Sequence, residues 1–164
     1  MHELTTDQIR AALVNCTKGE AKRMNLPTGL AGVAWQDLDF LGWRDPASPL
    51  LGGIATWRGD EPVAVALKAT LRPAGAKQSM CSLCLTVHSS GDIAFMGAKR
   101  AGGRGREGNT VAASMCADLA CSLYARKLKQ PRRVQPQETL GVEERVWRLQ
   151  GHLEKFLQRV VDGR

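Results

Sequence analysis

Four cysteines stand in two closely spaced pairs. Cys81 and Cys84 form a CxxC motif, and Cys116 and Cys121 form a CxxxxC motif after 31 intervening residues. A CxxC pair by itself could be a redox dithiol, half of a metal site or part of a disulfide framework. The second pair favours a metal site, because four thiolates complete the tetrahedral coordination of a structural zinc ion.

The spacing of the cysteines also predicts how the chain presents them. A tight CxxC knuckle would supply two sulfurs, a hairpin would carry the chain away and back, and the second pair would sit at the start of a helix. This order is that of a treble-clef zinc finger, whose core we expect over about 79–130. A thioredoxin-like dithiol is disfavoured because no βαβ pattern surrounds the CxxC.

Other groups could compete for a place in the site. His88 lies four residues after Cys84. With four cysteines available, we expect this histidine at the surface or beside the ligands, although it could replace one of them. The fifth cysteine, Cys16, follows Ile9 and Leu13 at helical spacing, so we expect a small buried apolar side chain there.

A site with four protein ligands has no open coordination position. Water activation is therefore not expected, and we predict a structural zinc ion and no enzyme activity. The three histidines (2, 88 and 152) are scattered, and neither HExxH nor GxSxG occurs in the sequence.

Length and composition indicate one globular domain over 1–164. The chain has 164 residues, of which 43% are hydrophobic and 24% charged. Its first 20 residues lack the apolar segment of a secretory signal, and no 18-residue apolar run predicts a membrane span. We therefore expect a cytoplasmic protein, in a compartment where structural disulfides are rare. We also expect a monomer.

The positive charge is concentrated in one segment. The formal net charge is +7. The stretch 97–133 contains nine basic residues against only Glu107 and Asp118, which is the whole excess. The basic residues are Lys99, Arg100, Arg104, Arg106, Arg126, Lys127, Lys129, Arg132 and Arg133. This segment has the charge to attract an acidic protein or a nucleic acid, or it is simply a solvated basic surface.

Helix caps, turn residues and hydrophobic periodicity predict the elements that position these residues. Thr5 and Gln8 form the capping box of a helix near the N-terminus. Short β-rich runs then predict strands at 50–57 and 62–70, joined by a turn at Gly59 and Asp60, and at 93–98 and 110–115. Helices are expected at 117–128 and about 140–161. The predicted fold class is α+β: a small antiparallel sheet with a four-cysteine treble-clef zinc finger, one N-terminal helix and a long C-terminal helix.

Two apolar patterns are assigned to the core. The C-terminal helix carries a stripe that we expect to bury against the rest of the domain rather than a partner: Val142, Val146, Leu149, Leu153, Phe156 and Val160. Of the four tryptophans (35, 43, 57 and 147), we expect three to pack the sheet rather than stack on a ligand.

The run GRGREG at 103–108 matches the dinucleotide-binding pattern GxGxxG. That pattern is meaningful after a strand, at the opening of a helix, and with an acidic residue about 20 positions later. Here it leads into a predicted strand, and position 128 lies among basic residues. We predict instead a flexible glycine-rich turn over 101–109, at the tip of the zinc hairpin, that projects Arg104 and Arg106 outward.

Several segments together resemble the FBP family of elongation factor G-binding proteins, whose members include the FusB-type fusidic acid resistance proteins. They are MCSLCLTVHSSG, GNTVAASMCADLACSLYARK, NCTKGEAKR and DFLGWRDP. The resistance-type proteins have a helical N-terminal domain ahead of the zinc finger. Here one predicted helix precedes β-rich sequence, so the chain resembles the zinc-finger domain standing almost alone.

The resemblance implies ligands and a partner. Cys81, Cys84, Cys116 and Cys121 would hold one zinc ion, and the domain would bind elongation factor G, possibly on the ribosome, and modulate its release. The implied contact residues lie around the hairpin and the following helix: Lys99, Arg100, Arg104, Arg106, Tyr124 and Arg126. The alternative is a zinc finger that binds ribosomal RNA through the same arginines, although aromatic residues are not interleaved with the basic run.

Overall fold

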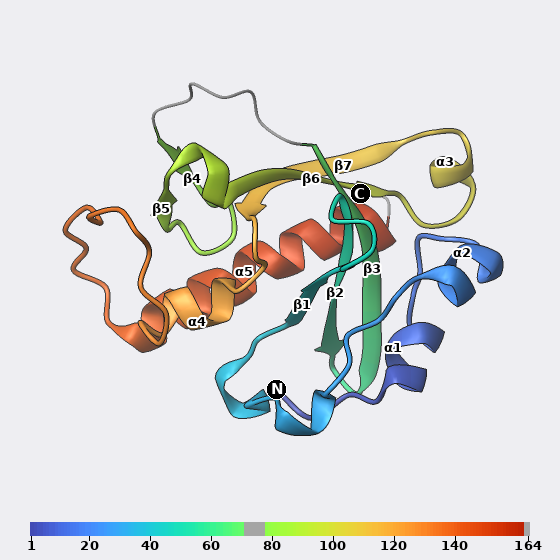
Figure 1. Ribbon diagram of the computed structural model, residues 1–164, viewed down its shortest axis with the longest axis horizontal. Helices are drawn as coiled ribbons and strands as arrows, with labels where there is room; N and C mark the ends of the chain where they lie inside the picture. The colour runs from blue at the N-terminus through green and yellow to red at the C-terminus, as the bar shows by residue number, and fades with distance from the viewer. Residues whose placement is uncertain (71–77, 163–164) are drawn as a thin grey trace.

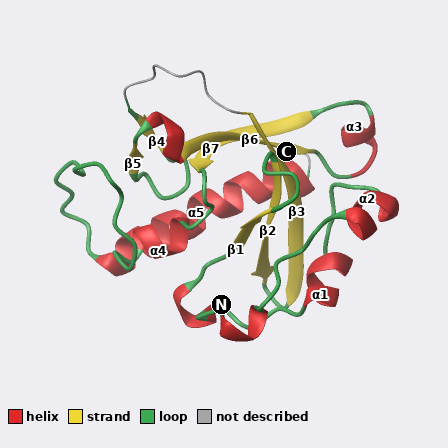
Figure 2. Ribbon diagram, viewed as in Figure 1, coloured by secondary structure: helices red, strands yellow, loops and turns green. Residues whose placement is uncertain are grey.

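The computed structural model describes residues 1–70 and 78–162. Its centre is an antiparallel sheet of five strands in the order β1-β2-β3-β6-β7 (Figures 1 and 2). The strands are β1 (Leu41–Arg44), β2 (Leu51–Arg58), β3 (Glu61–Thr70), β6 (Ile93–Lys99) and β7 (Thr110–Cys116). A second, two-stranded ribbon pairs β4 (Ser79–Met80) with β5 (Val87–His88). These observations confirm the predicted fold class.

The long helix α5 (Val142–Val161) covers one face of the sheet (Figure 1). Its side chains Leu149, Leu153, Phe156 and Val160 are buried in the main core, together with Leu157, which the predicted stripe omitted. At the start of the helix Val142 is 41% exposed. The prediction that the stripe buries within the domain is therefore confirmed for four of its six members.

The opposite face of the sheet is covered over β1, β2 and β3 by the N-terminal segment. A second apolar cluster forms there around Ile9, Trp35 and Trp43, with Trp57 partly buried against it. Trp147 on α5 is instead 67% exposed. The prediction that three tryptophans pack the sheet is confirmed. Strand β1 completes the sheet, although its four residues gave too short a pattern to predict.

The N-terminal segment contains two short helices, α1 (Thr6–Ala11) and α2 (Lys18–Arg23), where one was expected. Thr5 caps α1 with the predicted capping box, and Thr17 with Glu20 forms the same motif for α2. Between the helices the backbone leaves the helical conformation, and the Val14 N–H donates to the Ala64 carbonyl of β3. Cys16 therefore lies outside any helix and is only partly buried, so the expectation of a buried helical cysteine was wrong.

The hairpin of β2 and β3 turns at Gly59 and Asp60 as predicted, with Gly59 at φ +62°. The predicted strands 93–98 and 110–115 correspond to β6 and β7, whose pairing runs from Ile93 opposite Cys116 to Lys99 opposite Thr110.

Two local predictions need correction. The expected flexible turn over 101–109 contains a short helix, α3 (Gly102–Arg106), held to the end of α5 by a hydrogen bond from the Ala101 N–H to the Val160 carbonyl, 2.8 Å. The expected helix over 117–128 is only α4 (Cys121–Ala125). Leu119 and Lys127, with φ of +56° and +59°, turn the backbone left-handed on either side of it, which a continuous helix cannot accommodate.

Within the described residues, no helix combines the length and the apolar character needed to cross a membrane.

Candidate metal centre

The first two cysteines lie in a tight turn between β4 and β5. Leu85 donates its N–H to the Cys81 carbonyl, 3.0 Å, and closes the turn with φ of +60°. The Leu83 N–H points at the Cys81 sulfur, 3.4 Å. This is the knuckle that the CxxC spacing predicted. It is attached to the main sheet by a hydrogen bond from Ser82 N–H to the Ser114 carbonyl of β7, 2.7 Å.

The second pair comes from the end of β7 and the beginning of α4. Cys116 is the last residue of the strand and Cys121 the first of the helix. Between them the Leu119 N–H closes a turn on the Cys116 carbonyl, 2.9 Å. This turn packs closely on β1: a Cβ added to Gly42 would lie 2.4 Å from the Leu119 Cβ. Glycine at 42 therefore lets the metal site approach the sheet.

The four sulfurs converge as a metal site requires. All lie within 4.8 Å of one another and all four residues are buried. Cys81 and Cys121 sulfurs are 3.7 Å apart, and those of Cys84 and Cys116 are 3.5 Å apart. A tetrahedron with Zn–S bonds of about 2.3 Å has sulfurs about 3.8 Å apart. Because the cysteines are free rather than disulfide-bonded, the set fits one zinc ion.

The electrostatics of the four thiols show why they need a cation. Hydrogen bonds from Cys116, Cys121 and Cys84 hold the pKa of Cys81 well below its usual range. Hydrogen bonds with Cys116, Cys81 and Cys84 raise the pKa of Cys121, and the contact with Cys116 has the largest effect. One thiolate thus makes the next harder to form in a buried cluster. A bound zinc ion removes this conflict, because a coordinating thiol is deprotonated outright.

His88 lies directly beside the ligands. Its side chain is buried, and Nε2 is 3.3 Å from the Cys116 sulfur. The Tyr124 ring stands edge-on to the imidazole at 4.8 Å, and the Tyr124 hydroxyl donates to Asp118, 2.9 Å. Burial and this aspartate raise the pKa of Tyr124. Of the two places expected for His88, the one beside the ligands is confirmed.

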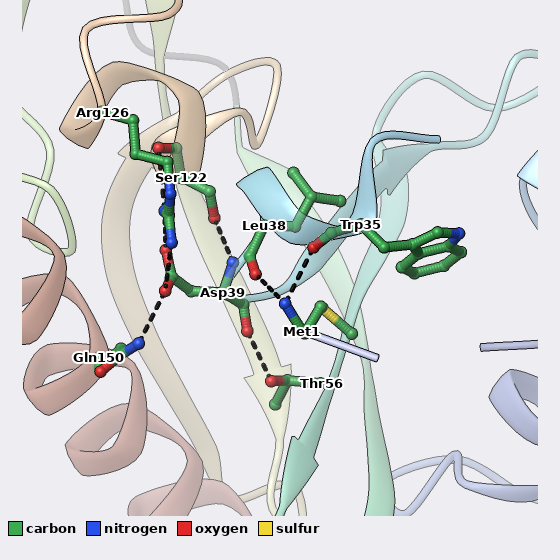
Figure 3. A network of polar contacts seen from close by, with 8 residues as sticks. All are labelled: Met1, Trp35, Leu38, Asp39, Thr56, Ser122, Arg126 and Gln150. Carbon is green, nitrogen blue, oxygen red and sulfur yellow. Dashed lines mark hydrogen bonds and ion pairs between the residues drawn. The ribbon is translucent and has the colours of Figure 1, made fainter. Parts of the chain in front are cut away.

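A buried polar network attaches α4 to the rest of the molecule (Figure 3). Asp39, in the segment before β1, receives Arg126 Nη2 at 3.1 Å and Gln150 Nε2 at 2.8 Å on its carboxylate. Its N–H donates to the Ser122 hydroxyl, 2.9 Å, and its carbonyl accepts from Thr56, 2.7 Å. This network was not predicted from the sequence, because no local pattern around Asp39 indicates its partners.

The same network meets the N-terminus. The Met1 amine donates to the carbonyls of Trp35, 2.9 Å, and Leu38, 2.8 Å (Figure 3). The segment that leads into β1 is thereby fixed from both sides, which holds Asp39 in place beneath α4.

The predicted partner-binding residues fall into two groups. The first lies where β6 and β7 turn at α3: Lys99, Arg100, Arg104 and Arg106. The second, Tyr124 and Arg126, lies on and after α4 beside the cysteines. Strand β6 has seven residues, so about 20 Å of strand separates the two ends of the hairpin. Figure 1 shows α3 and α4 at opposite sides of the molecule.

Fold and site together define a treble-clef zinc finger built onto a larger antiparallel sheet. The chain belongs to the FBP family: the family described as "FBP C-terminal treble-clef zinc-finger" matches residues 8–160. Among solved structures, that of the fusidic acid resistance protein FusC is similar, with a TM-score of 0.61 and 11% sequence identity. The similarity covers 98% of this chain and 60% of the FusC chain, and at this identity it shows the fold alone. No match was found among curated proteins.

Proposed function

We propose that this chain is a zinc-stabilised binding protein that engages elongation factor G and modulates its release from the ribosome. Membership of the FBP family carries the proposal, because the family resemblance implies this partner. The fold shared with a fusidic acid resistance protein supports it. The chain spans 60% of the length of FusC, so an effect on resistance is not part of the proposal.

The proposed action needs no chemistry at the metal. Four cysteine ligands leave a zinc ion without an open position, so the ion organises the fold. A protein of this kind acts by binding one state of its partner better than another, which shifts the population of factor bound to the ribosome. We propose further that the protein is a monomer and that it acts in the cytoplasm, where the translation factor is found.

We place the contact surface at the α3 end of the β6–β7 hairpin. Arg104 and Arg106 are exposed there, and Lys99 is 58% exposed in its side chain. Charges of this kind at the rim of an interface mainly set the rate of encounter and its salt dependence. Elongation factor G is acidic, so a basic end suits it. Tyr124 and Arg126 remain proposed contacts of lower rank, because each already has an intramolecular partner. The Tyr124 hydroxyl donates to Asp118, and Arg126 pairs with Asp39.

A pull-down from bacterial lysate tests the proposal. The zinc-loaded chain is immobilised, and lysate is applied with and without nuclease at two salt concentrations. We expect elongation factor G to be recovered after nuclease treatment, and less of it at the higher salt. Recovery of RNA alone would favour the nucleic-acid alternative and overturn the proposal.

Matched variants then locate the surface. Arg106→Gln removes an exposed charge at the α3 end, and Lys155→Gln removes one on the exposed side of α5. We expect the first variant to slow association with purified elongation factor G and the second to leave it unchanged. Equal effects of the two would mean that net charge, rather than this surface, governs binding.

A further inference from the structure

Among the described residues, one half of the sheet face opposite α5 is covered only in part, by the segment around α2 at its Lys99 end. The N-terminal cluster covers β1, β2 and the first part of β3. Beyond it, register places the following side chains on the same face: Lys68 and Thr70 of β3, Phe95, Gly97 and Lys99 of β6, and Thr110, Ala112 and Ser114 of β7. We call these eight residues the open face.

Phe95 stands in the middle strand of the open face and is 47% exposed. Its cross-strand neighbours are Thr70 and Ser114, and directly opposite residues in antiparallel strands share a face. Both neighbours are small, so one side of the ring is left free. A half-exposed phenyl ring contributes less to stability than a buried one. It does offer a surface on which a nucleobase can stack.

Two lysines follow the ring on the same face, Lys68 on the diagonal in β3 and Lys99 farther along β6. Lys68 is exposed opposite Gly97, and Lys99 lies four residues along β6 from Phe95. Lys99 pairs with Glu20 at 3.2 Å, but the side chains are 58% and 40% exposed. An exposed pair of this kind is weak, so a phosphate can replace the carboxylate. The open face thus places a stacking ring at one end and two cations in succession toward the Lys99 end of β6.

A cleft adjoins this face. It has a volume of about 490 Å³ and lies between α2 and the strands, with Lys68, Gly97 and Lys99 on one wall and Arg23 on the other. Its volume is in the range that holds a small molecule such as a nucleotide. The cations therefore continue from the ring into a space that could hold the next unit of a strand.

We propose that the open face binds single-stranded nucleic acid, with a base stacked on Phe95 and phosphates on Lys68 and Lys99. A protein partner is less well suited, because Phe95 has the hydroxyl side chains of Thr70 and Ser114 on its two sides and Lys68 on a diagonal, which do not form an apolar pocket. A duplex is excluded by the same geometry, since its bases are already stacked and cannot reach the ring. This site uses neither the cysteines nor the arginines of α3, and it shares only Lys99 with the proposed contact surface at the α3 end.

Fluorescence anisotropy with the zinc-loaded full chain tests the proposal. The probes are labelled ten-nucleotide strands, oligo(U) and oligo(dT), and a ten-base-pair duplex of the same length. We expect both single strands to bind more tightly than the duplex, and their relative affinity to show whether RNA or DNA is preferred. Phe95→Ala should weaken single-strand binding roughly 5- to 150-fold, the range for loss of one stacked base. Phe95→Tyr keeps the ring and should bind like the wild type.

Two controls separate stacking and phosphate contact from general stickiness and charge. Trp147→Ala removes a more exposed aromatic side chain on α5 and should change nothing. Lys68→Gln should lower the slope of log affinity against log salt by about 0.7, the value for one phosphate on a single strand, while Lys155→Gln should not.

Because a substitution could disturb folding, ultraviolet cross-linking of the wild-type complex gives a second reading. The cross-linked peptide is expected to contain Phe95. Equal affinities of the wild type and Phe95→Ala, absence of binding at low salt, or a cross-link confined to α3 would each overturn the proposal. If Phe95→Ala impaired only the recovery of elongation factor G, the open face would be a protein contact, and the proposal would be wrong.

Discussion

Asp39 and Arg126 are 87 residues apart in the chain and form a two-point ion pair beneath the surface. The side chain of Asp39 is 2% exposed and that of Arg126 17%. The pair joins the segment before β1 to the residue that follows α4, and Gln150 ties the same carboxylate to α5. The zinc finger and the larger sheet are thus fixed to each other by a polar contact as well as by the apolar core.

Loss of the arginine should therefore be costly. We expect Arg126→Met to lower the free energy of unfolding by about 3–5 kcal/mol, because the variant leaves a buried carboxylate without its cation. Urea denaturation of the zinc-loaded proteins measures this change. Arg106→Met, at an exposed arginine, is the matched control and should change stability by less than about 0.5 kcal/mol.

The same variant decides between two roles for Arg126. If Arg126→Met were as stable as the wild type but failed to bind elongation factor G, the residue would be a contact, as the family resemblance implies. If it is unstable, and the folded fraction binds normally, the arginine positions α4. We expect the second outcome, because the Arg126 side chain is only 17% exposed.

Metal binding should depend on the four converging cysteines and not on the fifth. We expect Cys116→Ser to lose stoichiometric zinc and to unfold the segment around β4, β5 and α4, because structural zinc contributes about 10–16 kcal/mol in small metal sites. Metal analysis and circular dichroism measure the two effects. Cys16→Ser is the control, since Cys16 is outside the cluster, and it should retain one zinc ion per chain. Unchanged zinc in Cys116→Ser would refute the ligand assignment.

Several parts of this structure follow from local patterns. The two cysteine pairs were sufficient to predict the metal cluster, because tetrahedral coordination needs four soft ligands and few other groupings in the sequence offer them. The stripe on α5 followed from helical periodicity, and the hairpin of β2 and β3 from β-rich runs around Gly59 and Asp60. The helix α2 also had a signal, the capping box of Thr17 and Glu20, which the prediction overlooked.

Other parts have no local signal. Leu119 and Lys127 adopt left-handed backbone conformations that non-glycine residues rarely take, so a sequence pattern continues the helix where the structure stops it. The partners of Asp39 come from segments 17 to 111 residues away, and only the assembled fold brings them together. The burial of His88 beside Cys116 likewise depends on how the β4–β5 ribbon docks, which the spacing of the cysteines does not determine.

The end of the β6–β7 hairpin tests how tightly α3 is packed. A Cβ added to Gly105 would lie 1.8 Å from the Arg100 carbonyl oxygen, which is backbone and cannot move aside. We expect Gly105→Ala to destabilise the protein by about 1–3 kcal/mol, the usual cost of overpacking. Gly103→Ala in the same helix is the control, because the nearest neighbour of its Cβ would be the flexible Arg106 guanidinium at 3.9 Å. Thermal unfolding compares the two variants. Equal effects would show that α3 is loosely packed.

Glu20 gives a prediction about pH. The Thr17 backbone N–H donates to its carboxylate, and with the Thr17 side chain and Lys99 this lowers the pKa of Glu20 to about 2 from an ordinary value of 4.5. A lowered pKa in the folded state means that the stabilisation is complete above about pH 4.5 and is lost as the pH falls toward 2. The contribution is small because the side chain is 40% exposed.

We therefore expect Glu20→Gln to be less stable than the wild type by about 0.5 kcal/mol at pH 6, and the difference to shrink steadily below pH 4.5. Glutamine retains the capping-box geometry, so the comparison isolates the charge. Chemical denaturation at matched pH values measures the difference, over the pH range in which metal analysis finds one zinc ion in both proteins. Glu107→Gln, an exposed glutamate outside the capping box, is the control. A difference between Glu20→Gln and wild type that stayed unchanged from pH 6 down to the lowest pH at which both proteins keep their zinc ion would show that the carboxylate charge does not stabilise α2.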